Sequence, residues 1–222
     1  KVVPPMLVRL DEEQKLAAAS EEEEEEGEGT QTQGRALLGV RELLRARPRE
    51  VLGYLLPKLT KPPVSISHAR TLEAVAEVTG TTLHFHASIL LPLLVGQMVI
   101  AEEEAGKEGG DEGEARRLVA LQSCTRTIVT SVESNGLQHL VVDLTKLLEA
   151  SDAATRRWGT WAVAALAKGT SADLRPQAPI LLKFLLPLMN DPQEAVWVPA
   201  VQALRTLLER LGVDEALSHL DF

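Results

Sequence analysis

Histidine side chains are the first candidates for chemistry in this sequence, because clustered imidazoles can bind a metal ion. His84 and His86 are two residues apart, which places them on different sides of a helix, so a shared metal ion is not expected. His68, His139 and His219 lie far apart, without a carboxylate or cysteine at the spacing of metal ligands. The sequence therefore predicts no metal site and no cofactor.

The one cysteine and the clustered glycines are equally weak signals for catalysis. Cys124, in VALQSCTRTIV, lies on an apolar helical stripe, which favours a small core residue over a nucleophile. The glycines of GKEGGDEG follow no strand and open no apolar helix, so they do not indicate a phosphate-binding loop. We therefore predict that the chain is not an enzyme. One cysteine cannot form an internal disulfide, which favours a reducing compartment, the cytoplasm.

Positive charge gives the sequence its candidate binding residues. Arginines crowd RELLRARPRE, where one predicted helix ends and the next begins, and two further pairs stand beside an acidic stretch and a tryptophan. The candidates for contact with a protein partner or RNA are Arg41, Arg45, Arg47, Arg49, Arg116, Arg117, Arg156, Arg157 and Trp158. Most of these arginines are expected to form a solvated face and to compensate helix carboxyl ends. If the fold aligns them on one ridge, they would contact phosphate, such as that of ribosomal RNA, without sequence specificity.

Two tryptophans leave a choice open. Trp158 and Trp161 are three residues apart in RRWGTWAVAAL and therefore share a helix face. Packing in the core is the favoured interpretation. The alternative is an exposed aromatic anchor for a partner, with Arg156 and Arg157 beside it as hydrogen-bond donors.

The composition predicts packed helices with two acidic inserts. Apolar residues make up 45% and aromatic residues only 3% of the 222 residues, so the core must be aliphatic. The net charge is -9, but residues 11–28 and 102–114 together carry -15, which leaves +6 on the rest. We expect inserts at 11–34 and 102–114 to be flexible, solvated loops, since they have little to bury. Each either merely tolerates solvent or attracts a basic partner.

A repeated pattern appears once the inserts are set aside. Prolines recur inside apolar helical runs, as in YLLPKL, ILLPLLVGQM and FLLPLMN, and Pro57 and Pro92 are 35 positions apart. A second helical pattern follows each run, and Ala162–Leu166 aligns with Ala200–Leu204 at an offset of 38. Pro62 and Pro63 are expected to stop the helix that contains Pro57. The predicted helices are Val2–Leu10, Arg35–Ala46, Pro48–Leu59, Ser65–Val78, His84–Ala101, Glu114–Val132, Leu137–Glu149, Ala153–Lys168, Arg175–Met189, Pro192–Leu211 and Asp214–Leu220.

Two helices per unit, with alanine where helices cross, resemble the HEAT repeat, whose period is about 40 residues. We therefore expect an all-α fold, a right-handed α-solenoid of about five helix pairs, with two disordered acidic loops. The array should occupy residues 1–222 and, because neither end looks like a polar cap, form a segment of a longer solenoid. The most apolar run, Ala87–Ala101, is too short to cross a bilayer and should be a buried helix.

The stretch GRALLGVRELLRARPREVLGYLLPKLTKPPV, Gly34–Val64, carries a more specific resemblance. It is similar to a segment in the later part of the HEAT-repeat translational activators of the general-control pathway. The resemblance implies a non-catalytic scaffold on the ribosome that helps to activate the kinase of initiation factor 2 alpha during amino-acid shortage. Its partners would be the ribosome, the kinase or co-activators, with no membrane and no small-molecule substrate. The alternative is a HEAT-repeat adaptor of another kind, a transport receptor or phosphatase scaffold, that binds basic proteins.

Overall fold

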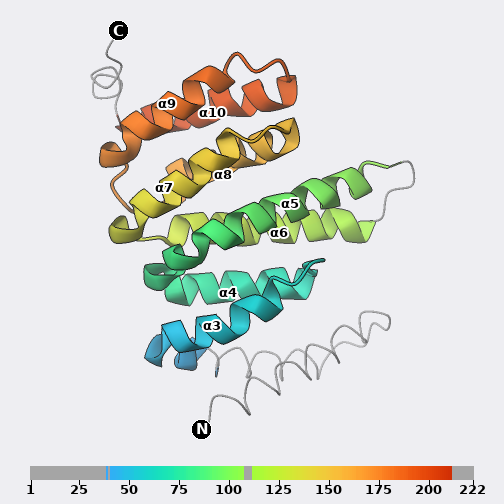
Figure 1. Cartoon of the computed structure of the whole chain (residues 1–222), viewed down its shortest axis with the longest axis vertical. Coiled ribbons are helices and arrows are strands. Elements are labelled where there is room, and N and C mark those ends of the chain that lie inside the picture. Colours follow the sequence, from blue (N-terminus) through green and yellow to red (C-terminus); the bar gives the residue numbers. More distant parts are fainter. Residues whose placement is uncertain (1–38, 40, 108–111, 212–222) are drawn as a thin grey trace.

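The computed structural model describes residues 39, 41–107 and 112–211, and this part of the chain is helical, with no strand (Figure 1). The helices are α3 (Pro48–Leu59), α4 (Ile66–Leu83), η1 (His84–His86), α5 (Ala87–Ala105), α6 (Glu112–Ser131), α7 (Ser134–Leu148), α8 (Ala153–Gly169), η2 (Arg175–Gln177), α9 (Ala178–Leu188) and α10 (Glu194–Leu211). Residues 41–46 are also helical. The predicted helices Val2–Leu10 and Asp214–Leu220, the insert 11–34 and the start of the predicted helix Arg35–Ala46 lie outside the described residues.

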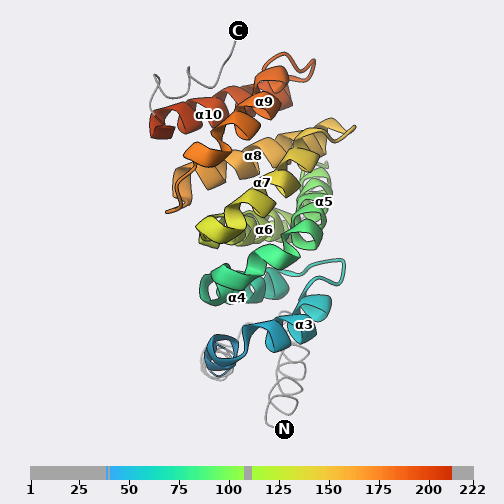
Figure 2. The same ribbon diagram turned by 60° about the vertical axis from the view of Figure 1, so that its left-hand side comes forward.

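The helices form two layers that run along the length of the stack. Helices α3, α5, α7 and α9 lie in one layer, and α4, α6, α8 and α10 lie in the other (Figures 1 and 2). Each helix packs on its partner from the same pair, and α4, α6, α8 and α10 also pack on one another in that order. The buried side chains are mostly leucine, valine and alanine, and they form a continuous core along the stack. The predicted all-α solenoid is confirmed.

Helix α3 shows how the sequence defines one unit. Its buried residues recur at spacings of three and four, and Pro48 occupies the first turn, where a missing N–H is harmless. The helix ends at Leu59, and Pro62 and Pro63 follow in the connection, as predicted. Helix α4 begins after Ser65, whose Oγ accepts a hydrogen bond from the backbone N–H of His68 at 3.2 Å.

The prolines inside helices α3, α5 and α9 are tolerated because of where they lie. Pro57, Pro92 and Pro187 all belong to the same layer, and all three are exposed. The two residues before each proline are mostly buried. The missing backbone hydrogen bond therefore falls on the solvent side, where water can bond the free carbonyl.

Both ends of the second acidic insert are helical. Helix α5 continues to Ala105, and α6 already begins at Glu112, so residues 102–105 and 112–114 of the predicted loop belong to helices. Glu102 is also only partly exposed, because it contacts the start of α8. Glutamate is a good helix former, so the composition of an insert does not by itself end a helix.

Other boundaries also differ from the prediction, by up to five residues. Helix α4 runs five residues beyond Val78, and α7 begins three residues before Leu137. The predicted helix Arg175–Met189 divides into η2 and α9, and α10 begins two residues after Pro192. The sequence TGTT suggested an end at Val78, but packing on α6 carries the helix through it with non-helical angles at Thr79.

The alignment of α8 with α10 also needs correction. The buried residues Gly159, Ala162, Val163 and Leu166 of α8 correspond to Ala200, Ala203, Leu204 and Leu207 of α10, an offset of 41 positions. The predicted offset of 38 is three shorter and would match Val163 with Val201, which is 38% exposed. Three residues are nearly one helical turn, so the apolar pattern alone fits either alignment.

Gly80 of α4 packs tightly against the backbone of α6. A Cβ atom on Gly80 would lie 2.1 Å from the backbone oxygen of Ser131. We expect Gly80→Ala to lower the free energy of unfolding by about 1–3 kcal/mol, because the backbones must separate. Gly53→Ala is the control, since Gly53 is in a helix with no neighbour within 4 Å of its Cβ position. That variant should be neutral or slightly stabilising. Equal urea denaturation midpoints for both variants would contradict the prediction.

Within the described part of the chain, one helical stretch, His84–Ala105, is long and apolar enough to cross a membrane. This is weak evidence for a membrane span, since a core helix of a folded domain can have the same length and composition. Its residues Leu91, Leu94 and Met98 are fully buried by neighbouring helices. Gln97, in the same helix, accepts hydrogen bonds from the backbone N–H of Val64 and from Arg117. The stretch packs as a core helix of the solenoid.

Candidate functional site

The first arginine group lies where α3 begins. Arg45 and Arg47 have 64% and 66% of their side chains exposed, and each pairs with a glutamate three positions away. The guanidinium of Arg49 lies over the ring of Phe85, 5.7 Å from its centroid. Arg41 is different, because it reaches α4 and pairs with Glu77 at 2.8 Å. Arg45, Arg47 and Arg49 therefore present positive charge outward, and we call them the α3 arginine group.

Arg117, by contrast, has an internal role. Its side chain is 10% exposed and donates to the backbone oxygen of Val64 at 2.8 Å and to Glu114 at 2.9 Å. It also donates to Gln97, which in turn accepts from the backbone N–H of Val64. These bonds fasten the connection after α3 to α5 and α6. Its neighbour Arg116 is 69% exposed and pairs with Glu112 on the same helix.

Arg156 also makes internal bonds, between two consecutive helix pairs. Its Nε donates to Asp191 at 2.8 Å, and its Nη1 donates to the backbone oxygens of Ala150 and Ser151 at 2.9 and 2.8 Å. Desolvation raises the pKa of Asp191, but hydrogen bonds from Arg156 and from the backbone N–H of Gln193 outweigh it and hold the pKa below its usual value. Arg156 therefore joins the connection between α7 and α8 to the one between α9 and α10.

Trp158 is buried in the core, as the favoured interpretation expects. Its side chain is 6% exposed, and its ring meets that of Trp161 edge to face, with centroids 5.6 Å apart. The indole N–H donates to Glu102 at 3.2 Å, and Glu102 also forms an ion pair with Arg157. The Arg157 guanidinium lies over the Trp158 ring. Partial burial of Arg157 lowers the pKa of its guanidinium.

The nine candidate residues do not form one ridge. Arg49 of the α3 arginine group lies over Phe85, just before the amino end of α5. Arg157 instead contacts Glu102 near the carboxyl end of α5, and Arg116 and Arg117 lie in the adjacent first turns of α6. Since α5 has 19 residues, the two groups are separated by roughly 28 Å along the helix axis. A binding surface at the start of α3 is therefore separate from a binding surface near Arg116.

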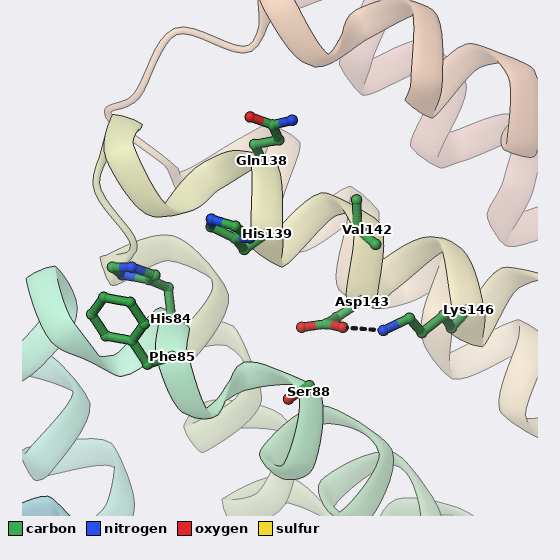
Figure 3. Close-up of a pocket in the computed structure, with 8 residues that line it drawn as sticks. All are labelled: His84, Phe85, Ser88, Gln138, His139, Val142, Asp143 and Lys146. Atoms are coloured by element: carbon green, nitrogen blue, oxygen red, sulfur yellow. Dashed lines mark hydrogen bonds and ion pairs between the residues drawn. The ribbon is translucent and has the colours of Figure 1, made fainter.

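The layer that contains α5 and α7 also has a groove that the sequence pattern did not reveal. His84, Phe85 and Ser88 line one side, and Gln138, His139, Val142, Asp143 and Lys146 of α7 line the other (Figure 3). The cavity has a volume of about 360 Å³. We call it the α5–α7 groove.

Two histidines meet at one end of this groove. The rings of His84 and His139 are stacked, with centroids 6.1 Å apart and an angle of 11° between their planes. Gly136 permits this, because a Cβ atom there would lie 2.5 Å from Cγ of His84. These histidines are 55 positions apart in sequence, so their contact could not be predicted from the spacing. The one local signal was Gly136 in NGLQH, because a glycine often marks a close contact.

The candidates for metal binding and for a thiol nucleophile gain no support from the structure. The described residues contain no group of three or more His, Cys, Asp or Glu side chains placed to hold a metal ion. Cys124 is fully buried, and desolvation, together with the charge of Glu73, raises the pKa of its thiol. Its predicted place in the core is confirmed.

The two-layered stack of helix pairs, with an aliphatic core and arginines that fasten successive connections, defines the class of the protein as an α-solenoid of helical repeats. A family model described as "Stalled ribosome sensor GCN1-like, HEAT repeats" matches residues 51–222. The chain belongs to this family. The predicted resemblance is confirmed, and the comparisons do not favour a HEAT adaptor of another kind.

Relatives extend the similarity across kingdoms. Protein ILITYHIA of Arabidopsis thaliana is 27% identical over 173 residues, 78% of this chain. Stalled ribosome sensor GCN1 of Homo sapiens is 25% identical over 186 residues, or 84% of the chain, and eIF-2-alpha kinase activator GCN1 of Saccharomyces cerevisiae is 24% identical over 184 residues, or 83%. The chain covers 6% of the length of each of these relatives. No solved structure matches the chain.

Proposed function

We propose that this chain is a non-catalytic scaffold segment of a cytoplasmic, ribosome-associated regulator that activates the kinase of initiation factor 2 alpha. The observation that carries this proposal is the family match over residues 51–222, together with relatives named as a stalled ribosome sensor and as an eIF-2-alpha kinase activator. Rigid stacking of helix pairs suits such a role, since a solenoid offers a long surface without a catalytic centre.

The α3 arginine group is the proposed point of contact with ribosomal RNA. Its side chains are exposed, and residues 41–50 hold four arginines against two glutamates, Glu42 and Glu50. The glutamate partners are themselves 72% and 68% exposed, so these ion pairs cost little to exchange for phosphate. Arg117 and Arg156 are excluded from this contact, because their guanidinium groups are occupied within the fold.

The test is a triple variant, Arg45→Glu, Arg47→Glu and Arg49→Glu. We expect it to lose cosedimentation with ribosomes at low salt. Its binding to ribosomal RNA fragments should weaken most at low salt, because each lost phosphate contact lowers the slope of log affinity against log salt concentration by about one. The control is Lys168→Glu, Arg175→Glu and Arg205→Glu, an equal change of charge at exposed positions further along the chain. Equal loss in both variants would show that only net charge matters, and no loss in the first would rule out this contact.

A further inference from the structure

We propose that the outward face of α5 is a docking site for an amphipathic helix of a partner protein, with basic residues at the end that meets the carboxyl end of α5. The face is the α5 stripe, which we define as Ile89, Pro92, Gly96, Ile100 and Glu103. None of these residues lines the α5–α7 groove. The inference does not depend on the proposed contact between the α3 arginine group and RNA.

The α5 stripe is a nearly straight row of residues on one side of the helix. Its members follow one another at spacings of three or four positions, which places them within about 80° of the helix circumference and along about 21 Å of its axis. Ile89 is 66% exposed and Ile100 is 46% exposed, and Pro92 and Glu103 are exposed as well. Helix α5 belongs to the layer that faces the viewer in Figure 1. A row with this spacing has the geometry that a second helix packs against.

The middle of α5 lacks the charges that a solvated helix face normally carries. No Asp, Glu, Lys, Arg or His lies between Ala87 and Ala101. The other helices of this layer each have an exposed cation, Arg49 on α3, Lys146 on α7 and Lys183 on α9. A helix that is apolar on nearly all sides is typical of a buried position. The free energy of the chain would therefore fall if a partner removed the α5 stripe from water.

Gly96 leaves a notch at the centre of the α5 stripe. A Cβ atom on Gly96 would have no neighbour within 4 Å, so the space above it is open. Pro92 and Ile100 stand four positions before and after Gly96 and border this space. In packed helices, a bulky side chain of one helix inserts into such a space between residues of the other. The notch therefore favours a partner helix with a large apolar residue at its centre.

The carboxyl end of α5 selects the charge of the partner. Residues 102–114 contain seven acids and one lysine, and Arg116, Arg117 and Arg157 pair with three of these acids, which leaves a net charge of -3. Glu103, the last member of the α5 stripe, is exposed and has no ion pair or hydrogen bond to a side chain among the described residues. Basic residues at the adjoining end of the partner helix complement this charge.

Fluorescence anisotropy with labelled helical peptides tests the proposal. The probe has four leucines on one helix face and three lysines at one end, and two versions place the lysines at the amino or the carboxyl end. We expect one version to bind the chain, and glutamates in place of its lysines should weaken binding about fivefold, the upper range for exposed ion pairs. The control peptide has the same composition, with its leucines spread around the helix. Absence of binding by both versions, or equal binding of the control, would overturn the proposal.

Two glycine variants locate the binding. Gly96→Leu fills the notch and should weaken binding of the probe at least tenfold, while the fold is retained because no neighbour is close to the new side chain. Gly53→Leu is the matched control, since Gly53 lies in α3 and likewise has no neighbour within 4 Å of its Cβ position. If both variants weaken binding equally, the α5 stripe is not the docking site.

A charge reversal tests the basic end of the partner. Glu103→Lys should weaken binding of the lysine probe about fivefold and strengthen binding of its glutamate version by a similar factor. Glu209→Lys reverses a glutamate that is 62% exposed on α10 and should change neither affinity. A Glu103→Lys protein with an unchanged preference between the two probes would contradict the assignment of a basic partner.

The glycine variants also distinguish two other occupants. If Gly96→Leu, and not Gly53→Leu, abolishes self-association in sedimentation velocity, the α5 stripe binds a second copy of the chain. If it abolishes binding to phosphatidylcholine vesicles, the stripe contacts a bilayer. Either result would overturn the assignment to a helix of a partner protein.

Discussion

Trp158→Ala is expected to lower the free energy of unfolding by about 3–5 kcal/mol, the usual cost of deleting a buried tryptophan. The ring is 6% exposed, packs against Trp161, and donates its N–H to Glu102. Deleting the ring leaves a cavity between α5 and α8, removes an aromatic contact, and deprives the Glu102 carboxylate of a donor. Urea denaturation followed by circular dichroism measures the loss.

Two comparisons separate this structural role from a role in binding. Trp158→Phe keeps most of the apolar volume and should cost clearly less than the alanine variant. Trp197→Ala removes a tryptophan that is 39% exposed on α10, and its effect on stability should also be smaller. An unchanged denaturation midpoint for Trp158→Ala, combined with lost cosedimentation with ribosomes, would instead support the anchor hypothesis.

The helices could be predicted from the sequence because their apolar spacing is local. Leu52, Leu55, Leu56 and Leu59 recur at three and four positions, and Pro48 and Pro62 mark where that pattern begins and ends. Such signals lie within one helix, so no knowledge of its neighbours is needed. The predicted bounds of α3 therefore agree with the structure to the residue.

The candidate site was harder to predict, because the role of each arginine depends on residues far away in the sequence. Arg156 and Arg45 both stand near acidic or polar neighbours in the sequence, yet Arg156 bonds Asp191, 35 positions later, and Arg45 pairs with Glu42, three positions earlier. Local charge patterns cannot distinguish a guanidinium that fastens two repeats from one that faces water. The stacking of His84 on His139 is hidden for the same reason.

Glu102 illustrates a different limit. Its position in an acidic run suggested a solvated insert, but it pairs with Arg157 and accepts from Trp158 across 56 positions. The composition of the run correctly marks a polar connection, since residues 106 and 107 leave the helix. It gives no information on which of its acids contacts the next helix pair, because that depends on how the pairs stack.

Arg156→Ala should also lower the free energy of unfolding, by about 1.5–3 kcal/mol, because it breaks a partly buried ion pair and leaves Asp191 without its partner. The Arg156 side chain is 16% exposed and that of Asp191 is 6% exposed, so water cannot replace the lost bonds fully. The backbone oxygens of Ala150 and Ser151 lose a donor as well. Arg156→Lys keeps the charge but not the forked geometry and should recover only part of the loss. Arg205→Ala, which removes an exposed arginine with a partner on the same helix, should leave the denaturation midpoint unchanged.

The same ion pair predicts how stability depends on pH. Because the pKa of Asp191 is lower in the folded chain, its contribution is fully present above the unfolded pKa, about 3.9, and is lost as the pH falls through the folded pKa. The melting temperature of the unmodified chain should therefore fall more steeply below pH 4 than that of Asp191→Asn, which has no carboxylate to protonate. If the melting temperatures of the two proteins fall in parallel between pH 6 and about pH 2, the Arg156–Asp191 pair does not contribute to stability. Arg156 would then orient the connections through its backbone contacts alone, and Arg156→Ala would be more damaging than Asp191→Asn at every pH.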